Sequence, residues 1–144
     1  AGLRCGFALA AQEVIQAMMK VIAPYPVPEP VAQIAAQALS KQGLLQMSQQ
    51  VLAIKAEKAK LKQALAEMAE IELVGDDKAN FILFRSAQKQ ALMAYLVDNG
   101  ILIRDQSKQL NLDNCLRITI GNPQQNEQLL AEIASFFAQQ EQTA

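Results

Sequence analysis

The chain has 144 residues, of which 51% are hydrophobic and 19% charged, so it can bury the core of one domain. A formal net charge of −1 and an aromatic content of 5% exclude the basic, aromatic surface of a nucleic-acid-binding protein. Histidine is absent, which excludes Ser-His-Asp and Cys-His catalysis and every histidine-ligated metal site. We therefore expect no bound metal.

The two cysteines, Cys5 and Cys115, lie far apart and match no zinc-ligand spacing. They are typical of reduced thiols, and we expect a cytoplasmic protein. The apolar run at residues 5–11 is too short to cross a membrane and is followed by Glu13. The sequence thus predicts no membrane segment.

The first thirty residues predict the end of one domain and a stiff connector. Gly2–Ala10 predicts a strand, and Gln12–Ile22 has apolar residues at helical spacing. Four of the five prolines then fall within residues 24–30, where neither a helix nor a central strand can continue. We place a boundary here, with residues 1–30 ending one domain and residues 31–144 forming a helical linker and a small second domain.

The middle of the chain predicts two helices and then a hairpin. Val31–Leu39 forms an Ala-rich helix that ends before Ser40, and Leu44–Met68 forms a long helix with one apolar face. The period then changes, because short apolar runs flank the turn residues Gly75–Lys78 and their two aspartates. These runs are Ile71–Val74 and Asn80–Phe84.

The last third predicts a helix, two strands and a closing helix. The helix is Gln88–Asp98, and the strands are Ile101–Arg104 and Cys115–Ile120. Asn122 and Gln125 predict a capping box at the start of the final helix. Hairpins that alternate with helices predict an α+β fold, a small and mainly antiparallel sheet with helices packed on one face.

Arginines are the candidate functional residues. In the strand around Arg117, alternation places the apolar residues on one face and Arg117 on the other, where its planar fork suits a carboxylate or phosphate. A salt bridge across the sheet is an equal alternative. Arg104 ends a strand, where sites often lie, but a surface pair with Asp105 also explains it. Arg4 stands between glycines that let an anion approach closely.

No catalytic base, nucleophile or metal cluster can be assembled from this sequence, and we expect no catalytic residue within it. Its acidic residues are scattered over predicted helix surfaces and turns. The residues by themselves thus predict an anion-binding α+β domain without a catalytic group of its own.

Several segments resemble known enzymes. Gly2-Leu3-Arg4-Cys5-Gly6-Phe7 looks like the end of the S-x-x-K…G-x-R-x-G signature of class II pyridoxal-phosphate aminotransferases. Ile103–Gln109, which contains R-D-Q, and Cys115–Gly121, which contains C-L-R-I-T, resemble the histidinol-phosphate aminotransferase family, as do residues 24–26 and 34–39. The resemblance covers essentially the whole chain, and its R-D-Q and C-L-R-I-T segments are the more specific part.

The resemblance implies an enzyme that transfers an amino group between glutamate and imidazole-acetol phosphate in histidine biosynthesis. It implies that Arg4 binds the phosphate of pyridoxal phosphate. It also implies that Arg117, assisted by Arg104, binds the substrates' anionic group: the phosphate of histidinol phosphate in one half-reaction and a carboxylate of glutamate in the other. Such enzymes are homodimers that act on small molecules.

The resemblance also places this sequence at the C-terminal end of the enzyme, with residues 1–30 ending the large cofactor-binding domain. The lysine that binds the cofactor covalently lies upstream of Arg4 in the family, so we expect it before Ala1 and expect the chain alone to be inactive. Two alternatives stay open: a related enzyme with a phosphate substrate, such as a threonine-phosphate decarboxylase, and a stand-alone α+β anion-binding or regulatory module.

Overall fold

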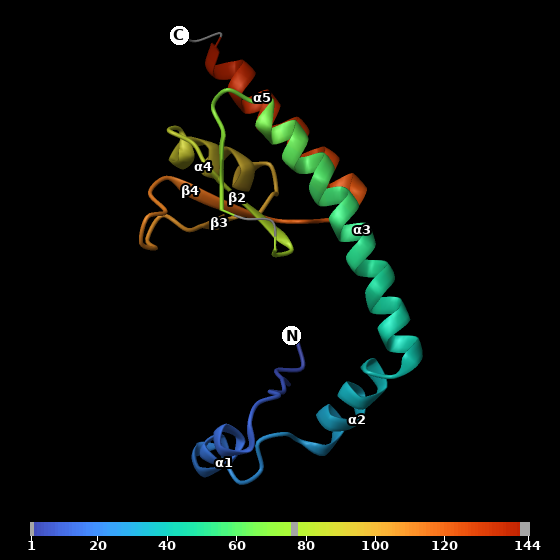
Figure 1. Cartoon of the computed structure of the whole chain (residues 1–144). Coiled ribbons are helices and arrows are strands. Elements are labelled where there is room, and N and C mark those ends of the chain that lie inside the picture. Colours follow the sequence, from blue (N-terminus) through green and yellow to red (C-terminus); the bar gives the residue numbers. More distant parts are fainter. Residues whose placement is uncertain (1, 76–77, 142–144) are drawn as a thin grey trace. The chain divides into compact units, whose positions relative to one another are not determined.

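The computed structural model describes residues 2–75 and 78–141, which divide into two compact units with a boundary between Gln49 and Gln50 (Figure 1). We call them the first unit and the second unit. In chain order the elements are α1 (Gln12–Val21), α2 (Glu29–Ala38), α3 (Lys41–Ala66), β1 (Glu72–Val74), β2 (Phe81–Arg85), α4 (Lys89–Asp98), β3 (Arg104–Asp105), β4 (Cys115–Thr119) and α5 (Pro123–Glu141).

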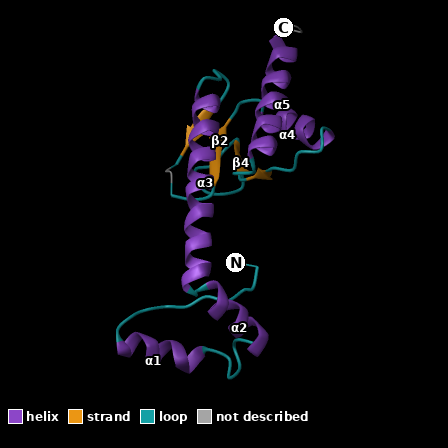
Figure 2. Ribbon diagram, turned by 90° about the vertical axis from the view of Figure 1, so that its right-hand side faces the viewer, coloured by secondary structure: helices purple, strands orange, loops and turns teal. Residues whose placement is uncertain are grey.

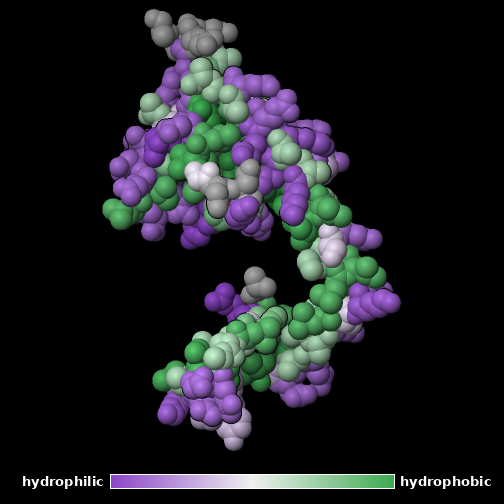
Figure 3. Space-filling view, in the orientation of Figure 1, coloured by the Kyte–Doolittle hydropathy of each residue, from purple (hydrophilic) through white to green (hydrophobic). Residues whose placement is uncertain are grey.

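The first unit exposes its apolar side chains. Neither α1 nor α2 has a buried residue, and Figure 3 shows hydrophobic surface spread over this part of the chain. The strand predicted at Gly2–Ala10 is wrong, since residues 2–11 form no strand. A strand needs backbone hydrogen bonds from a neighbour, and none of the described segments pairs with this one.

The junction between α2 and α3 differs from the expected break. Ser40 Oγ accepts a hydrogen bond from the backbone N–H of Gly43 at 3.2 Å, so α3 begins at Lys41 rather than at Leu44. A side chain at position 43 would meet the carbonyl oxygen of Ala38. Glycine is therefore needed for the close approach of the two helices.

The second unit contains a four-stranded antiparallel sheet in the order β1-β2-β4-β3, which confirms the α+β prediction. The edge strand β3 is shorter than the predicted Ile101–Arg104. Gly100 has a φ of +77° and ends α4, and the N–H of Ile101 bonds the carbonyl of Leu96 at 2.8 Å. The backbone at residue 101 therefore still follows the helix end and joins β4 only at Arg104.

Helices α3, α4 and α5 supply one hydrophobic core together with one face of the sheet, as predicted (Figure 2). The buried strand residues on this face are Ile82, Phe84, Leu116 and Ile118. Helix residues packed with them are Leu61, Leu65, Leu92, Leu96, Leu129, Ile133, Phe136 and Phe137. Cys115 of β4 is also fully buried, but its register places it on the opposite face. The alternate strand positions form the opposite face, which we call the open face; it bears Phe81, Leu83, Arg85, Arg104 and Arg117.

The predicted capping box at the start of α5 is confirmed. Asn122 Oδ1 accepts from the N–H of Gln125 at 2.9 Å, and Gln125 Oε1 accepts from the N–H of Asn122 at 3.0 Å. The predicted turn aspartates Asp76 and Asp77 lie outside the described residues.

Replacing Asn122 by alanine is expected to lower the free energy of unfolding of the second unit by about 1 kcal/mol, because one helix N–H loses its acceptor. Urea denaturation followed by circular dichroism measures this loss. Gln124→Ala, an exposed position in the same turn, is the control and should change stability by less than ~0.5 kcal/mol. Equal losses in both variants would show that the cap contributes nothing specific.

Candidate functional site

Arg117 lies on the open face in the middle of β4, as the alternation predicts. Its backbone is paired with Leu83 of β2 on one side and Arg104 of β3 on the other. The guanidinium carbon lies 5.0 Å from the centre of the Phe81 ring, diagonally across the strand pair. Such a cation–π contact contributes about 0.5–1 kcal/mol at an exposed site and restricts where the guanidinium points. Sequence reasoning missed Phe81, because it depends on the strand register.

Arg104 is the direct partner of Arg117 in the antiparallel ladder between β3 and β4. Directly opposed residues of such a pair share a face and hold their Cβ atoms close together. Among the described residues neither arginine has an ion pair or a side-chain hydrogen bond, although like charges directly opposite each other are destabilising. The backbone thus places two arginines side by side on the open face, with donors that have no partner among the described residues, and the guanidinium of Arg117 lies against Phe81 of β2. We call Arg104 and Arg117 the arginine pair.

Asp105 does not neutralise Arg104, which removes the surface-pair alternative. One carboxylate oxygen accepts from Lys89 Nζ at 2.9 Å, and the other accepts from the N–H of Ser107 at 2.8 Å and from its hydroxyl at 2.5 Å. These bonds, the Ser107 hydroxyl first and Lys89 second, hold the pKa of Asp105 well below its usual range. The carboxylate is therefore engaged with α4 and with the following turn.

Because the pKa of Asp105 is lowered by folding, we expect its stabilising contribution to be complete above its unfolded pKa, about pH 4, and to fade as the pH falls below it. As the pH falls, Asp105 takes up a proton in the unfolded chain at a higher pH than in the folded chain, and this favours unfolding. The difference in unfolding free energy between wild type and Asp105→Asn should then be smaller at pH 3 than at pH 7. A difference that does not change with pH would contradict this assignment.

A hollow of about 350 Å³ lies beside Arg104. Its lining offers one guanidinium, one ammonium group from Lys108 and the amides of Gln106 and Gln109, together with Asp105. Apart from the engaged carboxylate, these are donors suited to an oxyanion.

Arg85 shares the open face but has partners. It donates to Glu72 Oε2 at 2.7 Å and to the carbonyls of Asp113 at 2.9 Å and Asn111 at 3.4 Å. The hydrogen bond that Arg85 donates to the Glu72 carboxylate raises the pKa of Arg85. Arg85 thus fastens the loop between β3 and β4 and differs in role from the arginine pair.

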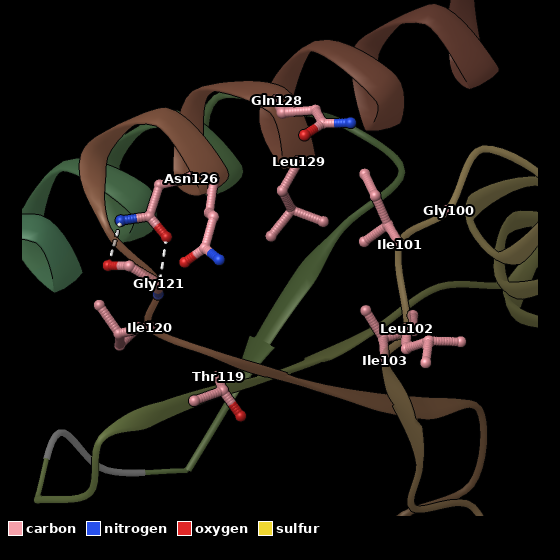
Figure 4. A pocket seen from close by; sticks show the side chains of 11 residues that line it. Gly100, Ile101, Leu102, Ile103, Thr119, Ile120, Gly121, Asn126, Gln128 and Leu129 are labelled. Atoms are coloured by element: carbon pink, nitrogen blue, oxygen red, sulfur yellow. Dashed lines mark hydrogen bonds between the residues drawn. The ribbon is translucent and has the colours of Figure 1, made fainter.

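A second hollow, of about 390 Å³, lies between the segment before β3 and the start of α5 (Figure 4). Leu102 and Ile103 line one side, and Leu129 and Asn126 of α5 line another, with Asn126 bonded to both backbone groups of Gly121. No charged residue is among those that line it. Its chemistry therefore does not suit an anion.

Arg4 belongs to the first unit. Its side chain is exposed and its φ is +52°. No cysteine, aspartate and glutamate side chains within residues 2–75 and 78–141 gather in a group of three that could hold a metal ion. In the same part of the chain, no helix combines the length and apolar character needed to cross a bilayer.

Comparison with known proteins points to one family. The family model of class I and II aminotransferases matches residues 1–133. A histidinol-phosphate aminotransferase of Pseudoalteromonas atlantica is 72% identical over 143 residues, which is 99% of this chain and 38% of that protein. One from Yersinia pseudotuberculosis is 50% identical over 134 residues, covering 93% of this chain and 35% of that protein. The chain therefore spans less than two fifths of the length of these relatives.

Solved structures share the fold. The histidinol-phosphate aminotransferase of Clostridium acetobutylicum superposes with a TM-score of 0.76 at 22% identity, over 88% of this chain and 38% of that one. The L-threonine-O-3-phosphate decarboxylase of Porphyromonas gingivalis superposes with a TM-score of 0.79 at 23% identity, over 95% of this chain and 42% of that one. With the family match over most of its length and this fold, the chain belongs to the class I and II aminotransferases.

Proposed function

We propose that this chain is the C-terminal part of a histidinol-phosphate aminotransferase, in which the arginine pair binds the anionic group of the substrate. The observation that carries the site is that Arg104 and Arg117 are directly opposed on one face without a carboxylate partner among the described residues. The 72% identity to the Pseudoalteromonas atlantica enzyme over 99% of the chain supports the choice of substrate class.

In this proposal Arg117 supplies a planar fork that binds two oxygens of a phosphate or a carboxylate. Both substrates of an amino transfer can use it in turn, the phosphate ester in one half-reaction and glutamate in the other. Arg104 adds a second positive charge, which favours a doubly charged phosphate over a singly charged carboxylate. The ring of Phe81 keeps the Arg117 fork from folding away when no substrate is bound.

Pyridoxal phosphate is the cofactor that the family uses, and Arg4 is the residue of this chain that would hold it. The guanidinium of Arg4 is exposed and has no ion-pair partner among the described residues, so its donors fit a phosphate group. When bound, the cofactor supplies the electron sink for amino transfer. The covalent lysine would come from sequence upstream of Arg4, so the chain alone should be inactive.

The same proposal assigns residues 1–30 to the end of the large cofactor-binding domain and residues 31–144 to the linker and small domain. The exposed apolar side chains of the first unit agree with it, because such surface is normally covered by other protein. We also propose a cytoplasmic homodimer as the working form of the longer protein.

The fold alone leaves a second candidate, since the decarboxylase of Porphyromonas gingivalis superposes as well as the aminotransferase of Clostridium acetobutylicum. The test is to assay the longer protein that contains this chain with histidinol phosphate and 2-oxoglutarate, and separately with threonine phosphate. Amino transfer from histidinol phosphate supports the proposal. Decarboxylation of threonine phosphate would replace it with the second candidate, and a natural gene product that begins near Ala1 would favour a stand-alone anion-binding module.

A further inference from the structure

The strand that carries Arg104 is weakly held by its own backbone. β3 has only two residues, and they pair with Arg117 and Leu116 of β4. Leu102, two residues before β3, is 85% exposed and is not part of the sheet. On the open face Arg104 lies directly opposite another arginine, Arg117, and a pair of like charges does not help to hold the edge strand against β4.

Asp105 fastens the same strand from its other face. Successive residues of a strand point to opposite faces, so Asp105 points toward the helices while Arg104 points to the open face. There it accepts from Lys89 Nζ at 2.9 Å, and Lys89 is the first residue of α4. Lys89 Nζ also donates to the hydroxyl of Ser107 at 3.0 Å, so the three side chains form a closed hydrogen-bonded ring.

This ring is partly shielded from water. The side chain of Lys89 is 15% exposed and that of Asp105 is 34% exposed. By comparison, the exposed fractions in the Arg85–Glu72 pair are 32% and 65%. A less exposed pair is screened less by salt, and the hydroxyl and backbone N–H of Ser107 restrict it further.

We propose that Asp105, tied to Lys89 and Ser107, is a positioning residue that holds the guanidinium of Arg104 beside Arg117 before the anion arrives. This inference rests on the proposed function, because it concerns how the same arginine pair is held ready. It assigns Lys89, on a helix away from the open face, an indirect part in anion binding. Preorganisation of this kind increases affinity, because the side chains that bind the ligand are already ordered and lose less conformational entropy on binding.

The test uses the 144-residue chain with ¹⁵N-labelled arginine side chains, titrated with inorganic phosphate at constant ionic strength. In the wild type the Nε–Hε signals of Arg104 and Arg117 should shift together with one dissociation constant. In Asp105→Asn and in Lys89→Met the Arg104 signal should respond about 10-fold more weakly, the size expected for one charge-assisted contact, while Arg117 still responds. Lys89→Met removes the ion pair with Asp105 without changing a residue of β3.

Charge alone predicts the opposite result for Asp105→Asn. Removing a carboxylate next to an anion site should tighten phosphate binding, so weaker binding identifies a loss of position. Glu72→Gln is the matched control, since it removes one carboxylate, the salt-bridge partner of Arg85, at the other edge of the sheet. It should leave the responses of Arg104 and Arg117 to phosphate as they are in the wild type.

The outcomes separate the inference from the function on which it rests. If phosphate shifts neither arginine in the wild type, the proposed anion site fails. If the wild type binds and Asp105→Asn binds equally well or better, with both signals moving together, the positioning role of Asp105 is overturned.

Discussion

Replacing Arg117 by alanine in the longer protein is expected to lower kcat/KM for the phosphate substrate by roughly 30- to 1000-fold, or ~2–4 kcal/mol, with little change in Tm. The variant removes a fork that has no carboxylate partner among the described residues, so folding loses little beyond the contact with Phe81. Steady-state kinetics and thermal denaturation of the same preparation measure the two effects.

Arg85→Ala is the matched control on the same open face. Arg85 bonds Glu72 and two loop carbonyls, so its loss should lower Tm while kcat/KM falls less than in Arg117→Ala. Arg117→Lys keeps the charge but not the planar fork, and should lie between wild type and alanine. If Arg117→Ala lowers Tm and leaves kcat/KM unchanged, Arg117 is a structural residue and the proposed site is wrong.

Replacing Leu116 by alanine is expected to lower the free energy of unfolding of the second unit by about 2–5 kcal/mol. Leu116 is fully buried on β4 and packs in the core that α3, α4 and α5 share with the sheet. The smaller side chain loses its transfer free energy and leaves a cavity between layers that cannot fully relax. Urea denaturation of the 144-residue chain, followed by circular dichroism, measures the change.

Leu110→Ala is the matched control, because Leu110 is 89% exposed in the loop between β3 and β4. It should change the unfolding free energy by no more than ~0.5 kcal/mol. A small loss for Leu116→Ala would mean that the helices do not pack on this face of the sheet, and the assignment of the open face would fail with it.

Local patterns accounted for much of the second unit. Alternation at Leu116–Ile120 identified both the buried face and the side on which Arg117 lies, because the period of a strand is two. Cys115 departs from it, since it is fully buried although it shares the face of Arg117. The capping box at Asn122 also formed as predicted, since it depends on neighbours within a few residues.

Other features depended on segments far apart in the chain. The predicted strand at Gly2–Ala10 did not form, because a strand is completed by its partners. Strand β3 has only two residues because the backbone at residue 101 still bonds the end of α4, and pairing with β4 begins at Arg104.

For the site, the sequence by itself determined which residue types were available: arginines placed on or beside strands, with no histidine and no catalytic cluster. Only the tertiary structure decided that Arg104 lies directly opposite Arg117, that Phe81 lies under the guanidinium, and that Asp105 bonds Lys89 instead of its neighbour. Strand register and helix packing bring these groups together across long stretches of chain. A pattern of neighbouring residues carries no information about such distant pairs, and the chemistry of the arginine pair arises from them.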